Sequence, residues 1–275
     1  MPKSIRKKPP ARNARSADKH ELYQLAVQAP DIDVPFLARW FARNAGRAPR
    51  TLREDFCGTA LLACHWVLAH SENRAIGVDL DAPTLAWGRT HNVATLLDDE
   101  QRTRLRLIRA DVRAVGVEAV DLVVAFNFSY SLFKTRDALR EYFIRVRDGL
   151  GRGGALVIDA WGGSETQDVR EERRRVADFT YCWDQHDFDP VSYHCDCRIH
   201  FRFQDGSVMR NAFRYEWRMW TLPELVELMH EAGYSDVQVL MEGTERDSGR
   251  GNGVFRRVLR ADADPAWIGY IAGRA

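Results

Sequence analysis

The 275-residue sequence has no long apolar run and few cysteines. No stretch approaches the roughly 20 apolar residues that a membrane-spanning helix needs, and no apolar segment typical of a secretory signal lies near its start. The five cysteines form an odd, scattered set, which argues against a disulfide framework: Cys57, Cys64, Cys182, Cys195 and Cys197. We therefore expect a cytoplasmic protein with no contact to a membrane.

Acidic and basic residues are nearly balanced overall, with a net charge of +1, but they are unevenly distributed. The segment 1–17 carries six basic residues and no acidic one, together with Pro9-Pro10 and little apolar content. This composition predicts a disordered basic tail. Such a tail could bind nucleic acid, although a solvated arm is the simpler interpretation and the one we favour.

The remaining segment, 18–275, has the composition of one packed domain, with 45% hydrophobic and 29% charged residues in the whole chain. Short apolar segments alternate with helical patterns. The expected strands are 50–54, 75–79, 105–108, 121–126, 155–158, 237–241 and 254–259. This alternation predicts an α/β fold with a doubly wound, mostly parallel seven-stranded sheet. Such sheets bind ligands at the carboxyl ends of their strands, where the strand order reverses.

An insert at about 180–219 interrupts this pattern. From Tyr193 to Phe203, and again from Phe213 to Met219, apolar residues recur at every second position, which predicts an antiparallel hairpin. A three-residue loop at Asp205–Ser207, or a bulge, would keep the aromatic side chains on one face. After the hairpin, Thr221 and Glu224 form a capping-box pattern that opens a helix.

Polar residues follow the first four expected strands. The first strand runs into Glu54-Asp55-Phe56-Cys57-Gly58-Thr59-Ala60, a turn whose glycine lets a ligand approach the backbone of a helix N-terminus. Asp79 ends the second strand about 20 residues later, where an acid can bind ribose hydroxyls. Asp111 follows the third strand, and Asn127-Phe128-Ser129-Tyr130 follows the fourth. These groups are expected to share one cleft.

These segments resemble those of the class I S-adenosylmethionine-dependent methyltransferases, over about Tyr23 to Leu259. Glu54–Ala60 is similar to the family's acid-x-Gly-x-Gly-x-Gly turn, Gly77–Leu80 to its ribose-binding strand end, and Ala110–Val112 to its adenine-contacting turn. The resemblance implies a Rossmann-like methyltransferase fold with S-adenosyl-L-methionine as cofactor.

The resemblance also implies roles for individual residues. Glu54 and the Cys57-Gly58 backbone would flank the methionine part, Asp79 would hold the ribose, and Asp111 would face the adenine amine. Leu80 and Val112 would enclose the adenine. The further expected cofactor-binding residues are Tyr23, Phe56, Thr59, Asn127 and Phe128.

The glycine turn departs from the family pattern. Phe56 and Ala60 stand where the first and third glycines are expected, so only Gly58 remains. The sequence therefore does not determine the shape of this loop. The segment also lacks the G-x-G-x-x-G of dinucleotide-binding folds and the lysine of a P-loop. Three acids at strand ends could also be solvated surface residues, but their order and spacing favour the cofactor site.

Residues that contact the methyl acceptor are less clearly marked. Tyr130, Trp161 and Arg246 are the candidates, the last on the 242–252 loop at the ligand face. Tyr130 and His186 are possible catalytic bases, needed only if the acceptor starts protonated. Segment 127–130 resembles the Asn-Pro-Pro-Tyr element of amino-directed DNA methyltransferases, but both prolines are missing, so that role is not transferred.

No metal site is expected. His194, Cys195, Cys197 and His200 are close in sequence, but strand alternation directs the two cysteines to one face and the two histidines to the other.

The sequence thus favours methyl transfer to a nitrogen or oxygen of a small molecule. Two alternatives remain open. One is methylation of RNA or protein guided by the basic tail, and the other is a non-catalytic protein that only binds the cofactor.

Overall fold

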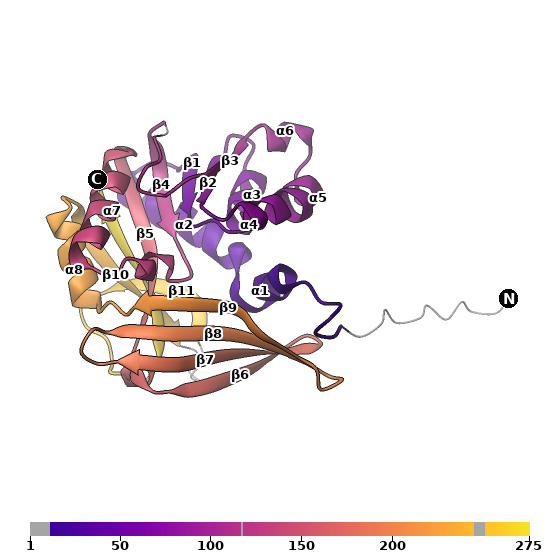
Figure 1. Cartoon of the computed structure of the whole chain (residues 1–275). Coiled ribbons are helices and arrows are strands. Elements are labelled where there is room, and N and C mark those ends of the chain that lie inside the picture. Colours follow the sequence, from indigo (N-terminus) through magenta and orange to yellow (C-terminus); the bar gives the residue numbers. More distant parts are fainter. Residues whose placement is uncertain (1–11, 117, 245–250) are drawn as a thin grey trace.

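The computed structural model describes residues 12–116, 118–244 and 251–275. Two sheets dominate these residues: an eight-stranded main sheet and a four-stranded insert sheet. Figure 1 shows helices on both sides of the main sheet, with the insert sheet lying across one end of it. No helix within the described segments is long and apolar enough to cross a membrane.

The main sheet has the strand order β11-β10-β12-β5-β4-β1-β2-β3. Its five parallel strands are β1 (Thr51–Asp55), β2 (Arg74–Asp79), β3 (Leu105–Arg109), β4 (Val120–Ala125) and β5 (Leu150–Gly162). Because β1 lies between β2 and β4, the chain reverses direction across the sheet at β1. The carboxyl ends of β1 and β4 therefore border the expected crevice.

Three further strands complete the main sheet: β10 (Ser235–Thr244), β11 (Gly251–Val258) and β12 (Trp267–Arg274). β12 pairs antiparallel with both β5 and β10. The doubly wound α/β architecture is confirmed, and β12 adds one strand to the seven that the sequence predicts. Two glycines interrupt the apolar run of β12, Gly269 and Gly273, which weakens its strand pattern.

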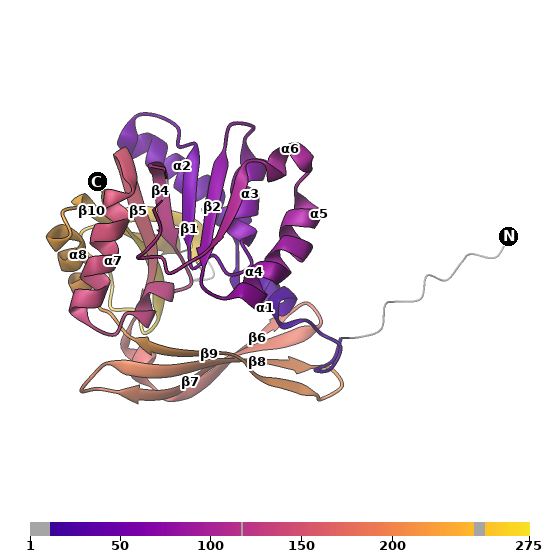
Figure 2. The ribbon, with the colours of Figure 1, turned by 45° about the horizontal axis from the view of Figure 1, so that its top comes forward.

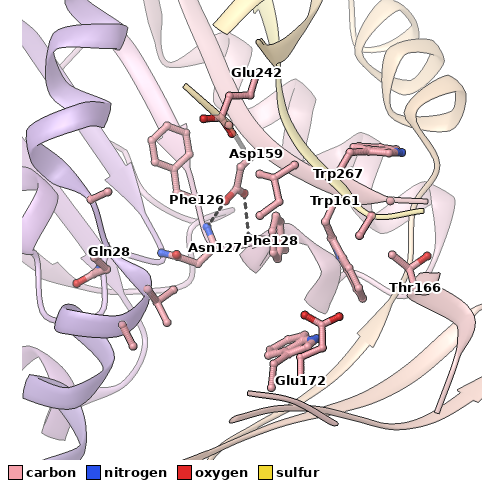
Figure 3. A pocket seen from close by; sticks show the side chains of 18 of the residues that line it. Gln28, Phe126, Asn127, Phe128, Asp159, Trp161, Thr166, Glu172, Glu242 and Trp267 are labelled. Atoms are coloured by element: carbon pink, nitrogen blue, oxygen red, sulfur yellow. Dashed lines mark hydrogen bonds between the residues drawn. The ribbon is translucent and has the colours of Figure 1, made fainter. Parts of the chain in front are cut away.

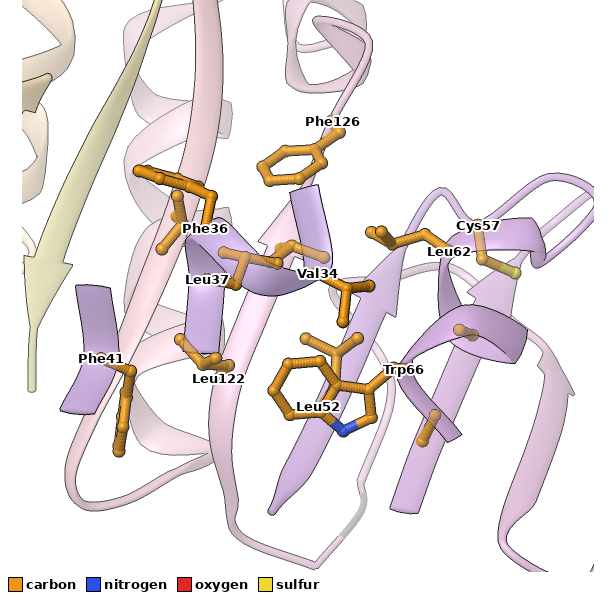
Figure 4. Close-up of a cluster of buried hydrophobic side chains, with 14 of the residues drawn as sticks. Val34, Phe36, Leu37, Phe41, Leu52, Cys57, Leu62, Trp66, Leu122 and Phe126 are labelled. Carbon is orange, nitrogen blue, oxygen red and sulfur yellow. The ribbon is translucent and has the colours of Figure 1, made fainter. Parts of the chain in front are cut away.

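Helices cover both faces of the main sheet and bury two apolar cores. On one face α2 (Pro30–Ala45) and α3 (Leu61–Ala69) pack on the sheet, and Figure 4 shows Phe36, Leu37 and Trp66 in that core. On the other face lie α7 (Arg136–Asp148) and α8 (Leu222–Glu231). Four large apolar residues of α7 recur at helical spacing and are buried: Leu139, Tyr142, Phe143 and Val146.

Shorter helices line the edge near β2 and β3. They are α4 (Ala82–Gly88), a π-helical turn (Arg89–Val93), α5 (Ala94–Leu96) and α6 (Asp99–Arg102), with 3-10 turns at Ser129–Leu132 and Ser164–Gln167. The predicted caps are present. Asp81 accepts a hydrogen bond from the Thr84 amide at 2.9 Å, and Thr221 and Glu224 form the capping box of α8.

The insert sheet is larger than the expected hairpin. It contains β6 (Arg170–Val176), β7 (Phe179–Asp189), β8 (His194–Phe203) and β9 (Val208–Arg218), joined antiparallel in that order. β6 escapes sequence-based prediction because its residues 171–175 are charged and exposed, as is common in edge strands. Figure 2 shows the insert sheet as a layer beneath the ends of the main-sheet strands.

The β8–β9 hairpin has both the three-residue loop and the bulge that the sequence pattern allows. Phe203 and Ser207 enclose the three-residue loop 204–206, one residue earlier than expected, with Gly206 at φ 82°. A register shift then lies between Ile199 and Phe201. Odd-numbered residues therefore oppose odd-numbered ones, as in the pair Cys197 and Tyr215, which confirms the predicted facing of the aromatic side chains.

The N-terminal segment connects the two sheets. Within the predicted tail, residues 14–16 form a turn, and the Ala14 amide donates to the Ser207 hydroxyl at 3.0 Å. Arg12 forms ion pairs with Glu21 and Asp178. Because these groups have partners, residues 12–17 are placed against the fold, although the composition predicts a disordered tail up to Ala17. Residues 1–11 lie outside the described residues. Helix α1 (Lys19–Val27) follows and packs on the insert sheet.

Candidate active site

Two adjoining cavities lie at the carboxyl ends of the main-sheet strands. The strand-end cavity, about 810 Å³, is lined by the turns after β1, β2 and β3 and by β9. The aromatic cavity, about 830 Å³ and shown in Figure 3, lies between the main and insert sheets. Both cavities are lined by Tyr23, Gln28, Asn127 and Tyr215, so they meet at these residues.

The turn after β1 keeps the shape that glycines would give it. Phe56, Gly58 and Ala60 have φ values of 56°, 52° and 57°, all in the left-handed region. Two residues with a Cβ thus adopt the conformation that glycine favours, at a cost of order 1 kcal/mol each. The turn therefore holds two non-glycine residues in a strained conformation.

Neighbouring elements hold this turn in place. The Asn92 side chain donates to the Thr59 carbonyl at 2.8 Å, and Gln24 of α1 donates to the Thr59 hydroxyl at 2.8 Å. Gly88 of α4 lies against the Thr59 backbone so closely that a Cβ would come within 2.4 Å of its carbonyl oxygen. The position of the turn therefore depends on the absence of a side chain at Gly88.

Asp79 ties the end of β2 to the turn. One of its carboxylate oxygens accepts from the Gly58 amide at 2.7 Å, and the other accepts from the Asp81 amide at 2.8 Å. Each carboxylate oxygen has two lone pairs, so both retain acceptor capacity toward the strand-end cavity that Asp79 lines.

The ends of β2 and β3 together supply an apolar slot beside Asp79. Leu80 is 66% exposed and Val112 is buried, and both line the strand-end cavity. Asp111 lies there too, with its carboxylate bound by the Arg113 guanidinium at 2.7 and 3.1 Å. These hydrogen bonds from Arg113 lower the pKa of Asp111, so it is a carboxylate at neutral pH.

Glu54 lies on the side of the aromatic cavity. It is buried, and its Oε2 accepts from the Ala63 amide in the first turn of α3 at 3.0 Å. Burial, with added repulsion from the carboxylates of Asp79, Asp33 and Asp55, raises its pKa to about 8. Glu54 and Asp79 are thus close enough to interact, although they line different cavities.

Asp159 shapes the loop after β4 and was not identified from the sequence. Its carboxylate accepts from the amides of Asn127 and Phe128 at 2.6 and 2.9 Å. Both of these residues have left-handed φ values, 57° and 56°. Burial raises the pKa of Asp159 to about 7. The only signal in the sequence is an acid directly after the apolar run of β5.

A buried ionic network lies beneath the strand-end cavity and was also missed. The Arg53 guanidinium binds both oxygens of Asp55, at 2.6 and 2.9 Å, and donates to the Val112 carbonyl at 2.9 Å. The Tyr142 hydroxyl of α7 donates to Asp55 at 2.9 Å. Arg53 therefore connects β1 to the turn that carries Val112.

The aromatic cavity is lined by ten aromatic residues from both sheets and α1. They are Tyr23, Phe126, Phe128, Trp161, Tyr181, Trp183, Tyr215, Trp217, Trp267 and Tyr270. Trp161, a predicted acceptor residue, lies between the rings of Phe128 and Trp183, at centroid distances of 5.7 and 6.1 Å. Figure 3 shows Trp161 projecting into the cavity.

The structure sorts the sequence-predicted residues into three groups. Ten of the cofactor candidates line the strand-end cavity: Tyr23, Phe56, Cys57, Gly58, Thr59, Asp79, Leu80, Asp111, Val112 and Asn127. Glu54 and Phe128 line the aromatic cavity instead.

The other candidates are placed elsewhere. Tyr130 is 2% exposed in the core and lines neither cavity, because the 3-10 turn directs it inward. His186 is exposed on β7 beside Asp184, also outside both cavities. The Cys195 and Cys197 side chains are in the apolar cluster with Trp217. Arg246 lies outside the described residues.

Comparisons with known proteins identify the fold. No family model matches the sequence, and no curated protein matches it either. Among solved structures, one similar protein is an S-adenosylmethionine-dependent methyltransferase from Clostridium acetobutylicum, at TM-score 0.66 and 15% identity, with 93% of this chain and 96% of that chain covered.

Two further similar structures are described as methyltransferases of sugars. CalS10 of Micromonospora echinaspora, an amino pentose methyltransferase, has TM-score 0.63 and 16% identity, covering 93% of this chain and 96% of that one. The sugar N-methyltransferase KedS8 of a Streptoalloteichus species has TM-score 0.61 and 16% identity, covering 100% and 98%. The chain therefore has the Rossmann-like fold of S-adenosylmethionine-dependent methyltransferases.

Proposed function

We propose that this protein is a methyltransferase that uses S-adenosyl-L-methionine to methylate a small molecule. The observation that carries the proposal is the pair of joined cavities, one lined by the three strand-end segments and the other by aromatic side chains. The first suits an adenosyl group and the second a compact acceptor, and they meet where the methyl group would be transferred.

The strand-end cavity fits the adenosyl part of the cofactor. Leu80 is a large apolar side chain left 66% exposed, and with Val112 it offers apolar contacts to an adenine ring. Asp79 keeps free lone pairs for ribose hydroxyls, and Asp111, held as a carboxylate by Arg113, accepts from the adenine amine.

Glu54 fits the amino group of the methionine part. Its Oε1 has no hydrogen-bond partner within the described segments, and Glu54 lines the cavity next to the turn. When bound, the cofactor supplies a methyl group activated by a positively charged sulfur. The chain then has to align the acceptor with that methyl group and exclude water, which the insert sheet and α1 do by covering the site.

A small acceptor is favoured over RNA. The aromatic cavity is lined mainly by acids among its charged residues, and such a surface repels a phosphate backbone. Two of the similar structures are described as acting on an amino pentose or a sugar, which agrees with a small acceptor.

Calorimetry with S-adenosylmethionine and S-adenosylhomocysteine tests this proposal. The intact chain should bind both, and Asp79→Ala should weaken binding about 100-fold, since it removes two charge-assisted hydrogen bonds. Asp99→Ala is the control, because Asp99 is 98% exposed on α6 and lines neither cavity, and it should bind like the wild type. If the folded intact chain binds neither compound, the proposal is wrong.

A further inference from the structure

We propose that the methyl acceptor is an amine that enters the aromatic cavity as a cation. This inference rests on the proposed function, because it names the acceptor class for the same site. It derives from the acidic residues, the burial and the aromatic lining of the cavity.

Acidic residues dominate the charged lining of the aromatic cavity. Among the described residues that line it, seven are acidic and one, Arg174, is basic; the acids are Asp33, Glu54, Asp159, Glu165, Glu172, Glu242 and Asp264. Arg174 donates to the Ala26 carbonyl, and its guanidinium lies over the Tyr181 ring. Glu165 and Glu172 pair with Arg170 of β6.

Asp33, Glu54 and Asp159 are among the acids that form no ion pair with a basic side chain in the part of the chain that the structure describes. Glu54 is 6% exposed and Asp159 is 9% exposed, and both accept only backbone amides. Asp33 accepts from the Tyr270 hydroxyl at 2.6 Å.

Their pKa values reflect this lack of positive charge. Burial raises the pKa of Asp33 to about 6, of Glu54 to about 8 and of Asp159 to about 7, and Asp33 contributes to raising the other two. Each group is therefore destabilised when ionised. A cationic ligand would relieve this penalty, whereas a neutral alcohol would not.

The cofactor accounts for only part of this charge. Its amino group would bind Glu54, at the edge of the cavity nearest the strand-end turn. Asp33 and Asp159 remain. Figure 3 shows Asp159 and Glu242 on the main-sheet side of the cavity and Glu172 on the insert-sheet side, so carboxyl groups surround the space from both directions.

The aromatic lining supports a cation as well. Tyr215 and Trp217 stack at 4.4 Å, Trp183 lies 6.1 Å from Trp217, and all three rings line the aromatic cavity. Ring faces attract ammonium groups through their negative electrostatic potential. A metal cation is disfavoured, because no three His, Cys, Asp or Glu residues converge on a metal position within the described segments.

The reaction balances without a further reactant. The ammonium form of the acceptor first gives one proton to a cavity carboxylate and so exposes its nitrogen lone pair. That pair forms the new nitrogen–carbon bond while the sulfur–methyl bond breaks and its electrons stay on sulfur. The product is a methylated ammonium ion and a neutral thioether, and the carboxylate returns its proton to water.

The first test compares amines with the matching alcohols, using cofactor-loaded full-length protein. The probes are cyclohexylamine with cyclohexanol and 2-phenylethylamine with 2-phenylethanol. Mass spectrometry measures methylated product, and calorimetry measures binding. We expect each amine to bind at least tenfold more tightly than its alcohol and to carry all detectable methylation. Equal or stronger binding of the alcohols, or methylation of an alcohol, overturns the inference.

The second test removes one cavity charge while keeping its hydrogen bond. Asp33→Asn can still accept from Tyr270, and Asp31→Asn is its matched control, because Asp31 is exposed in the same first turn of α2 and lines neither cavity. Asp33→Asn should weaken amine binding about tenfold and leave alcohol and S-adenosylmethionine binding within twofold. Asp31→Asn should change none of them.

The outcomes separate the two proposals. Failure of the intact protein to bind S-adenosylmethionine contradicts the proposed function itself. Cofactor binding without any preference for amines contradicts only the inference. If Asp33→Asn weakens cofactor binding and not amine binding, Asp33 belongs to the cofactor site and the inference is wrong in its central residue. Matching unfolding temperatures for both variants exclude a folding defect.

Discussion

The two cavities differ in charge and in how the chain builds them. The strand-end cavity is balanced, with Asp79, Asp81 and Asp111 against Lys19, Arg113 and Lys134. The aromatic cavity has seven acids against one arginine. The first is made mostly by turns that directly follow strands of one sheet, whereas the second needs both sheets and residues of α1, α2 and α3.

This difference shows that the two cavities depend on different parts of the fold. Consecutive parallel strands carry their end residues to one edge by topology alone, so a neutral, general cofactor site follows from the strand order. The proposed acceptor side adds residues of the insert sheet and of α2 to that edge, while Glu54 and Asp159 belong to β1 and β5 of the main sheet. Variants that affect one cavity and not the other test this separation.

The largest effect is expected from Arg53→Met, beneath the strand-end cavity. The variant leaves the Asp55 carboxylate buried without its cation and frees the Val112 carbonyl. Breaking one partner of a buried ion pair costs about 3–5 kcal/mol of unfolding free energy. Urea denaturation measures this loss. A change below about 1 kcal/mol, the scale of exposed pairs, would show that the network is not structurally important.

A smaller and more local effect is expected from Gly88→Ala. The new Cβ would lie 2.4 Å from the Thr59 carbonyl oxygen, so the turn after β1 must shift. Overpacking of this kind costs about 1–3 kcal/mol, and we expect about tenfold weaker S-adenosylmethionine binding by calorimetry.

Gly116→Ala is the control for this variant, because a Cβ at Gly116 would meet nothing within 4 Å. It should leave cofactor binding unchanged. Binding by Gly88→Ala that equals that of Gly116→Ala would mean that the turn is not part of the cofactor site.

A pH-dependent effect on stability concerns Glu54, which lines the aromatic cavity. Its folded pKa of about 8 exceeds the ordinary 4.5, because of burial and the carboxylates of Asp79, Asp33 and Asp55. Between these values the folded state holds a proton that the unfolded state has lost. Glu54 therefore lowers stability as pH rises from 4.5 to about 8, by up to about 1.4 kcal/mol per pH unit.

Glu54→Gln keeps an acceptor for the Ala63 amide and removes this titration. The unfolding free energy of the wild type should fall relative to that of the variant as pH rises from 5 to 8. Parallel pH profiles of the two proteins would show that Glu54 is already ionised at low pH.

Much of the strand-end cavity could be predicted from the sequence. Asp79 and Asp111 follow apolar strands at recognisable spacing, and topology alone brings them together. The aromatic cavity was less predictable, because Trp161 lines it whereas Tyr130, the other residue expected near the acceptor, is buried in the core. A 3-10 turn at Ser129–Leu132 directs Tyr130 into the core, and no local pattern encodes that direction.

The sequence by itself determined the alternation of strands and helices, the caps at Asp81 and Thr221, and the acids at the strand ends. Each of these depends on residues close together in the chain. Only the tertiary structure decided that Phe56 and Ala60 would adopt glycine-like φ values and that Asp159 would hold the loop after β4. It also decided that Asp33, Glu54 and Asp159 would face one aromatic space. These features arise from contacts between distant segments, and the energies of these contacts outweigh the local backbone preferences of the residues.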